Sequence, residues 1–356
     1  MPDESRPYQS WTAIAAAVKA AAVDRHRTEG GGSLTVGDHI KMATIDRFLS
    51  RVFAEGDQSE WLLKGGTAML ARVPRTRRTR DVDLAATGGA ELDEAVAELE
   101  RLAQADLGDH IRFTLIRQDD TGRGDTQPGV RTRKAVWACW AGHRKIDEIQ
   151  VDLVVGPAPV GRVEIREPAS RLPLARPLRA YPYRLFPIAD QVAEKVSATM
   201  STAYPGGRSS SRVKDLVDLV VIARTQRVDL RELQLAIASK RASSRLAPFE
   251  RLRPPDGWGP TYRAMAKTVP AAAEHADIES ATELMDEFLT PALAAEPAPE
   301  GMVWLPGRGW LPEDKAELEQ HEAEQPSETV DGGAVWVQPH VRAGSPVAGH
   351  WRSPRT

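Results

Sequence analysis

Two aspartates one residue apart, Asp81 and Asp83, are the residues of this sequence best suited to chemistry on phosphates. On a β-strand, both carboxylates would project from the same face. Upstream of them, Gly65-Gly66 predicts a turn whose backbone N–H groups can approach phosphates closely. Paired carboxylates can hold a divalent metal ion against the same triphosphate. This order of motifs is what a nucleotide-transferring or nucleotide-polymerising site requires.

A third acid, Asp152, lies among apolar residues in the segment 151–155. An unpaired carboxylate buried there would be costly, and a polar partner or a metal ion would remove that cost. Clustered carboxylates repel one another unless a cation lies between them, and Mg²⁺ or Mn²⁺ accepts a few carboxylates together with substrate phosphates. We therefore expect Asp81, Asp83 and Asp152 to bind metal. The alternative is a surface strand that carries solvated acids.

Arginines are concentrated between the glycine turn and the acids, at positions 72, 75, 77, 78 and 80. They could bind nucleotide phosphates or the backbone of an RNA, and a solvated basic loop is the alternative. Thr79 precedes Asp81 by two residues and would share its face of the strand. We count Arg77 and Thr79 among the expected nucleotide-binding residues.

In combination, these motifs resemble the AbiEii/AbiGii toxin family of nucleotidyltransferases, whose mycobacterial relatives are the MenT toxins. The resemblance spans about residues 40 to 290. It rests on the segments GGTA at 65–68, RRTRDVDL at 77–84, the acid Asp152, DQVAEK at 190–195 and RVKDLVDL at 212–219. The order of all these segments together is far more specific than any one of them.

The resemblance implies a DNA polymerase β-like nucleotidyltransferase core followed by a helical C-terminal part. It implies that Asp81 and Asp83 are the metal-binding acids and that Lys195 and Asp215 are catalytic. It also implies that the turn of residues 64–67 cradles the triphosphate of an NTP. That turn consists of Lys64, Gly65, Gly66 and Thr67. Many members have Gly-Ser where this chain has Gly-Gly, so the second glycine removes a hydroxyl that could contact phosphate. Whether the neighbouring Thr67 replaces that hydroxyl stays open.

Lys195 and Asp215 also have simpler physical interpretations. Lys195 lies at the edge of the apolar stripe of an expected helix over 188–200, where a lysine often extends along the surface into water. In a site, its ammonium could reach a β- or γ-phosphate. Asp215 lies near the start of an expected helix, where a carboxylate meets the helix dipole favourably. In a site, it could orient Lys195 or accept a proton from the attacking hydroxyl.

The elements that must position these residues follow from hydrophobic spacing. Helices are expected over 11–27, 36–53, 67–72, 91–107, 188–200 and 213–225, with further helix in 230–239 and 260–293; strands are expected over 60–64, 80–85, 111–116, 130–140 and 146–155, the last three antiparallel. The fold class is therefore α+β with a mixed sheet. We expect an N-terminal helix and linker over 1–34, the nucleotidyltransferase core over 35–186, a helical domain over 187–294 and a Pro/Gly-rich, partly disordered tail over 295–356.

The composition fits a cytoplasmic enzyme. The 356 residues carry a net charge of −3, which argues against a protein that coats nucleic acid. A single cysteine, Cys139, excludes an internal disulfide, and neither a signal segment nor a membrane span is evident.

We expect a Mg²⁺-dependent toxin that transfers NMP from an NTP to RNA, by family analogy to the tRNA 3′ end, with an antitoxin as partner. Two alternatives stay open. The protein could bind nucleotide, RNA or an antitoxin without turnover, or it could modify a hydroxyl of a protein or small molecule.

Overall fold

The computed structural model describes residues 7–30, 34–88, 91–120, 132–201, 210–324, 335–337, 340–342, 345–347 and 350–352. The chain divides into two compact units, Met1–Trp310 and Leu311–Thr356. The second unit contains helix α10 (Glu313–Glu324) and four short strands, β11 (Val335–Val337), β12 (His340–Arg342), β13 (Ser345–Val347) and β14 (His350–Arg352). In that unit β11 pairs with β14, and β12 pairs with β13.

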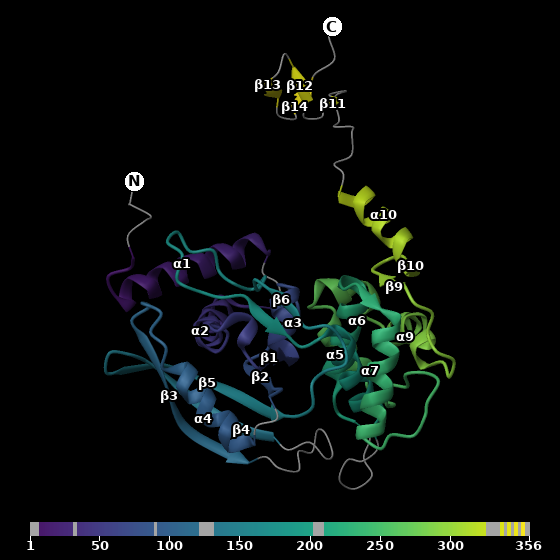
Figure 1. Cartoon of the computed structure of the whole chain (residues 1–356), viewed down its shortest axis with the longest axis horizontal. Coiled ribbons are helices and arrows are strands. Elements are labelled where there is room, and N and C mark those ends of the chain that lie inside the picture. Colours follow the sequence, from purple (N-terminus) through teal and green to yellow (C-terminus); the bar gives the residue numbers. More distant parts are fainter. Residues whose placement is uncertain are drawn as a thin grey trace. The chain divides into compact units, whose positions relative to one another are not determined.

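A seven-stranded mixed sheet forms the centre of the first unit, with the strand order β3-β4-β5-β2-β1-β7-β6 (Figure 1). Its strands are β1 (Trp61–Lys64), β2 (Asp81–Ala86), β3 (Ile111–Asp120), β4 (Thr132–Ala141), β5 (Arg144–Val155), β6 (Glu164–Arg166) and β7 (Tyr183–Leu185). Strands β3, β4 and β5 are antiparallel, as predicted, whereas β2 runs parallel to β5. Strands β6 and β7 lie between residues 155 and 188, where no strand was expected. The predicted α+β class is confirmed.

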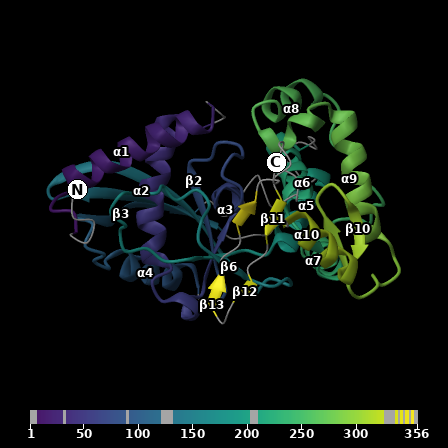
Figure 2. The same ribbon diagram turned by 90° about the horizontal axis from the view of Figure 1, so that it is seen from above.

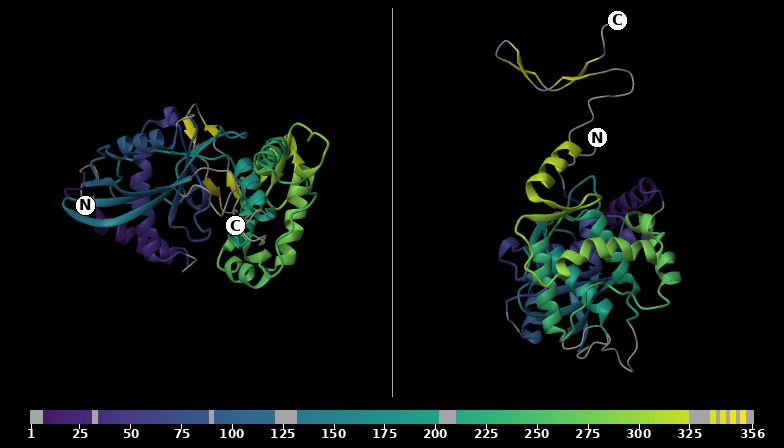
Figure 3. Two further views of the ribbon diagram at one scale, coloured as in Figure 1. Left: turned by 90° about the horizontal axis from the view of Figure 1, so that it is seen from below. Right: turned by 90° about the vertical axis from the view of Figure 1, so that its right-hand side faces the viewer.

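Along the chain, helices of the first unit come before, between and after the strands of the sheet. They are α1 (Trp11–Thr28), α2 (Val36–Val52), η1 (Gly56–Gln58), α3 (Gly65–Arg72), α4 (Leu92–Ala103), α5 (Ile188–Met200), α6 (Val213–Thr225), α7 (Leu230–Ser243), α8 (Gly259–Ala266), η3 (Pro270–His275) and α9 (Ile278–Leu293). Figure 2 shows α5 to α9 gathered beside the sheet, and Figure 3 shows the same arrangement from two further sides. None of the described helices has the length and apolar content needed to cross a bilayer.

The two faces of the sheet differ because side chains alternate along each strand. Val82, Leu84, Val151 and Leu153 point to one face and pack in the core formed with α2, α3 and α4. The intervening residues of β2 and β5 therefore point to the opposite face. This second face, which carries the acids, is the one that positions the candidate site.

The helices that follow the sheet have their own core. Helix α6 is its centre, because its residues from Leu216 to Ala223 are buried almost throughout. A small second sheet, β10-β9-β8, extends it with β8 (Val228–Asp229), β9 (Met302–Leu305) and β10 (Gly309–Pro312). Trp304 of β9 is buried and packs edge-on against Phe288 of α9, with ring centroids 5.0 Å apart. The predicted domain boundaries, including the one near residue 295, stay predictions.

Candidate active site

The acids of β2 and β5 lie side by side. The parallel register of the two strands places Asp83 opposite Asp152 and Asp81 opposite Gln150. Asp83 and Asp152 share the face of the sheet that points away from the α2–α4 core, and Asp81 is on the same side of β2 because it is two residues from Asp83. Asp152 is therefore not buried among its apolar neighbours. Its side chain is 31% exposed, because Val151 and Leu153 point to the opposite face.

The glycine turn touches both the acid of β2 and the loop before it. Gly65 has a φ of +62°, a conformation that residues with a Cβ adopt at a cost. A Cβ at Gly65 would lie 1.8 Å from Asp83 Oδ2, and one at Gly66 would lie 2.8 Å from Thr79 Oγ1. The two positions therefore require glycine for space, and Gly65 also for conformation. The turn, Asp83 and Thr79 form one packed unit.

The electrostatics of this face favour a bound cation. Burial, and then the neighbouring Asp152, raise the pKa of Asp83 to about 6, against the opposing effects of Lys64, Lys195 and Lys214. Burial also raises the pKa of Asp152, to which Asp81 contributes and which Lys134 and Lys214 oppose. The positive charges of the chain thus leave the carboxylates under-neutralised.

The acids of β2 and β5 are too few to hold a metal ion with protein ligands alone. Within the described residues, no three His, Cys, Asp or Glu side chains are grouped so that they could hold a metal ion. Mg²⁺ commonly binds one or two carboxylates and takes its remaining ligands from water and substrate phosphates. The oxygen donors of this face therefore fit an ion that is bound together with a nucleotide.

Lys195 lies in a buried ion network with helix α6. Its Nζ donates to Asp218 Oδ2 at 2.6 Å and to Asp215 Oδ1 at 3.2 Å. The alternative interpretation of Lys195 as a lysine that extends into water is wrong, since the residue is only 7% exposed. Burial lowers the pKa of Lys195, but Asp218 and Asp215 outweigh this effect and the pKa is raised overall. Lys195 is therefore a fixed positive charge, and it is close enough to act on Asp83.

Asp218 also joins this network to the arginine loop. The Nε and Nη2 atoms of Arg77 each donate to one Asp218 oxygen at 2.7 Å. Arg212 donates from Nε to Asp215 Oδ2 at 2.5 Å. Arg77 was expected to contact nucleotide phosphates, but its guanidinium is engaged with Asp218 and only 14% of its side chain is exposed. The structure gives Arg77 the task of connecting the loop before β2 to α6.

Thr67 and Lys64, which were also expected to bind the nucleotide, are likewise hydrogen-bonded to other parts of the chain. The Thr67 hydroxyl is buried and donates to the Asp81 carbonyl oxygen at 2.8 Å, so it holds the start of β2 rather than facing a ligand. Lys64 donates from Nζ to Glu194 Oε1 at 2.5 Å and lies 4.2 Å from the centre of the Phe186 ring. Lys64 nevertheless acts on Asp83 and lines a cavity beside it.

Comparison with known families identifies the family to which the chain belongs. A family model described as "Nucleotidyl transferase AbiEii toxin, Type IV TA system" matches residues 47–290, more than half of the chain. The chain belongs to the AbiEii nucleotidyl transferase toxin family. No curated protein sequence matches it.

Several solved structures are similar to this AbiEii family member. MenT4, a nucleotidyltransferase toxin from Mycobacterium tuberculosis, matches with 16% identity and a TM-score of 0.47, over 80% of this chain and 90% of MenT4. JHP933 from Helicobacter pylori matches with 14% identity and a TM-score of 0.37, over 80% and 96% of the two chains. A putative nucleotidyltransferase from H. pylori gives 14% and 0.36, over 69% and 92%.

In this AbiEii chain, several side chains at the site were not singled out from the sequence. Asp218 lies three residues after Asp215 and so on the same side of α6, a spacing that could have indicated it. Gln191 donates from Nε2 to the Gly65 carbonyl oxygen at 3.2 Å and fixes the turn against α5. Lys214 is exposed and acts electrostatically on both Asp83 and Asp152. Neither Gln191 nor Lys214 has a local sequence signal that distinguishes it.

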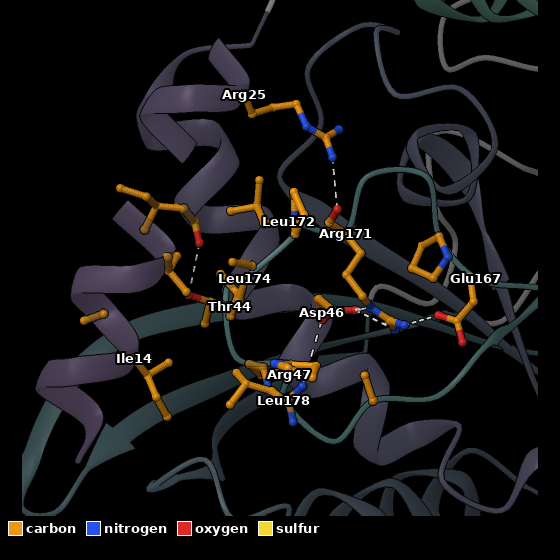
Figure 4. Close-up of a pocket in the computed structure, with 18 of the residues that line it drawn as sticks. Ile14, Arg25, Thr44, Asp46, Arg47, Glu167, Arg171, Leu172, Leu174 and Leu178 are labelled. Atoms are coloured by element: carbon orange, nitrogen blue, oxygen red, sulfur yellow. Dashed lines mark hydrogen bonds and ion pairs between the residues drawn. The ribbon is translucent and has the colours of Figure 1, made fainter. Parts of the chain in front are cut away.

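A larger cavity of about 440 Å³ lies elsewhere in the AbiEii chain, between α1, α2 and residues 167–180 (Figure 4). Apolar side chains, among them Ile14, Leu172 and Leu174, form most of its wall. Its charged groups have partners: Asp46 accepts from Arg171 Nε at 2.9 Å, and Arg47 pairs with Asp109, which lies outside the cavity lining. This cavity therefore lacks the uncompensated carboxylates that mark the face with Asp83.

Proposed function

We propose that this nucleotidyltransferase toxin transfers NMP from an NTP to an RNA acceptor, with the 3′ end of tRNA as the acceptor, and releases pyrophosphate. One observation carries the proposal. Asp83 and Asp152 lie in register beside the Gly65 turn, and the pKa of each is raised. Lys134 lies 3.9 Å from Asp152 and other lysines act on both acids, but these charges do not offset the burial and mutual repulsion of the pair. Two such carboxylates next to a glycine turn suit an NTP that arrives with divalent metal.

The residues that would hold Mg²⁺ or Mn²⁺ are Asp83 and Asp152, with Asp81 at the exposed end of β2. Their oxygen donors match these hard cations. When bound, the ion would neutralise charge on the reacting phosphate and on the departing pyrophosphate.

The chain's own positive groups would bind the phosphates from the other side. The first N–H groups of α3, at the Gly65–Gly66 turn beside Asp83, could donate to a phosphate. Lys195 supplies a fixed charge because two carboxylates hold it in place. Lys214 is exposed and can move to meet a phosphate.

Asp152 is better placed than Asp215 to serve the attacking hydroxyl. Asp215 is fully buried and engaged with Lys195 and Arg212, whereas Asp152 is accessible, so one of its oxygens could hold the ion while the other accepts a proton. In this scheme the acceptor oxygen attacks the α-phosphorus as its proton passes to Asp152. The bond from the α-phosphorus to the pyrophosphate oxygen breaks, and pyrophosphate leaves.

The proposal is tested by incubating the purified chain with tRNA, Mg²⁺ and each α-labelled NTP in turn. We expect label on the RNA with the unsubstituted chain and none with Asp83→Asn. Asp57→Asn, which changes an exposed acid outside the site, is the matched control and should transfer normally. Label on the protein instead of RNA, or nucleotide binding without transfer from any NTP, would contradict the proposal.

A further inference from the structure

We infer that the cavity beside Asp83, between the ends of β2 and β5 and helix α7, is a nucleoside subsite that receives the base and ribose of a reacting nucleotide. This inference rests on the proposed function and extends it from the phosphates to the nucleoside. The cavity holds about 380 Å³, within the range of small-molecule sites. It is distinct from the larger cavity in Figure 4.

The position of the cavity follows from strand alternation. Ala85 lines it and lies two residues after Asp83, and Val154 lines it and lies two residues after Asp152. Residues two apart share a face and lie about 7 Å apart along a strand. The cavity therefore begins within one nucleotide's reach of the carboxylates, on the same face. Lys64 connects the two, because it lines the cavity and acts on Asp83.

The two walls of the cavity differ in chemistry. The sheet side offers small apolar surfaces, from Ala85 and Val154 to the prolines at 157 and 159, against which a flat ring can pack. The opposite wall is one face of α7, because Ser239 and Ser243 are four residues apart and both line the cavity. The Ser239 hydroxyl can donate and accept hydrogen bonds, whereas the Ser243 hydroxyl donates to the Lys240 carbonyl oxygen at 3.0 Å and can still accept. Both can therefore contact ribose hydroxyls or base edges.

Charged groups at the floor add directional contacts. Glu194 of α5 accepts from Lys64 at 2.5 Å, and Lys240 of α7 lies 3.7 Å from the same Glu194 oxygen. A carboxylate can accept from a base amino group, and an ammonium can donate to a base carbonyl. A cavity with apolar walls, hydroxyls on one side and an acceptor between two donors matches a nucleoside better than it matches a hydrocarbon or a simple anion.

A nucleoside could reach this cavity from two sources, the NTP or the last nucleotide of the acceptor RNA. The chemistry that recognises it is the same. The sources are separated by measuring KM for the NTP at saturating RNA and KM for the RNA at saturating NTP.

The experiment fills the cavity from its exposed side. Ser239→Trp and Ser243→Trp place a large ring at its mouth, while Ala238→Trp places the same ring on an exposed position of α7 that does not line it. All three positions are exposed, and circular dichroism and thermal unfolding confirm that each variant is folded. We expect both serine variants, but not Ala238→Trp, to raise one of the two KM values at least about tenfold. A higher KM for NTP assigns the cavity to the NTP, and a higher KM for RNA assigns it to the acceptor.

Binding provides a second readout. If the cavity takes the NTP's nucleoside, nucleoside monophosphates should compete with NTP in the unsubstituted chain and more weakly in Ser239→Trp. Unchanged KM values in both serine variants would overturn the inference. In that case, transfer that is still lost in Asp83→Asn would leave the proposed function intact.

Discussion

Replacing Asp83 by asparagine should make the protein more stable and inactive at once. The Asp83 carboxylate is ionised at neutral pH although its burial and Asp152 both oppose the charge, and these effects raise its pKa to about 6 from an ordinary 3.8. Asparagine keeps the shape of the side chain and removes the charge. The repulsion from Asp152 disappears with it.

The size of the effect follows from the pKa. A pKa of about 6 in place of 3.8 corresponds to a penalty of at most about 3 kcal/mol in the free energy of unfolding. Because the carboxylate partly faces water, we expect about 1–2 kcal/mol, or roughly 2–4 °C in Tm. The folded state binds more protons than the unfolded state between pH 3.8 and about 6, so the stability due to Asp83 falls as pH rises through that window.

The assay is thermal unfolding in EDTA at pH 8 and pH 5. The Asp83→Asn protein should melt higher than the unsubstituted chain at pH 8, and the difference should shrink at pH 5, where Asp83 is mostly protonated. Asp57→Asn should match the unsubstituted chain at both values. An Asp83→Asn protein that melts at or below the unsubstituted chain at pH 8, or a difference that persists at pH 5, would refute the reasoning.

Four further outcomes follow from the same contacts. Gly65→Ala should lose activity and lower Tm. The control is Gly142→Ala, which has a similar φ of +58° but no atom within 4 Å of its Cβ, and it should show only the backbone cost of about 1–2 kcal/mol. Equal Tm losses in the two variants would contradict the contact between Gly65 and Asp83. Asp218→Asn should lower the free energy of unfolding in urea by about 3–5 kcal/mol, because Lys195 and Arg77 lose a buried partner, and a loss below about 1 kcal/mol would count against the network. Thr67→Val should cost about 1 kcal/mol in urea and lower kcat by loosening the start of β2, so an unchanged kcat would argue against this positioning role. As pH falls below about 6, the Mg²⁺ concentration for half-maximal activity should rise about tenfold per pH unit, because protons compete with Mg²⁺ for the Asp83 carboxylate. A Mg²⁺ requirement that does not change with pH would exclude Asp83 as a ligand.

The sequence predicted the individual parts of the site better than their connections. Alternation along a strand is local, so Asp81 and Asp83 could be placed on one face without the structure. The register that puts Asp83 opposite Asp152 depends on a parallel pairing between strands separated by about 60 residues, and no local pattern determines it. The antiparallel strands β3 to β5 are consecutive segments with strand-like hydrophobic spacing, whereas the pairing of β2 with β5 has no such signal.

The arginine loop shows the same limit. Its arginines look alike in sequence, yet Arg72 bonds Glu164 and the Phe186 carbonyl, Arg77 bonds Asp218, and Arg78 pairs with Asp38. Each partner comes from a different, distant segment. Helical spacing placed Lys195 at the edge of an apolar stripe but could not show that α6 covers it. Local spacing therefore predicts which face a residue occupies, but not which element packs against that face.

The most direct measurement of the central claim is pyrophosphate release from NTP in the presence of tRNA, with Mg²⁺ or EDTA. The central claim is that Asp83 and Asp152 form the reaction centre. We expect release that requires both RNA and Mg²⁺ in the unsubstituted chain and in Asp57→Asn, and that falls to background in Asp83→Asn and in Asp152→Asn although both remain folded. Release that continues in either of these two variants, or in EDTA, would contradict the account.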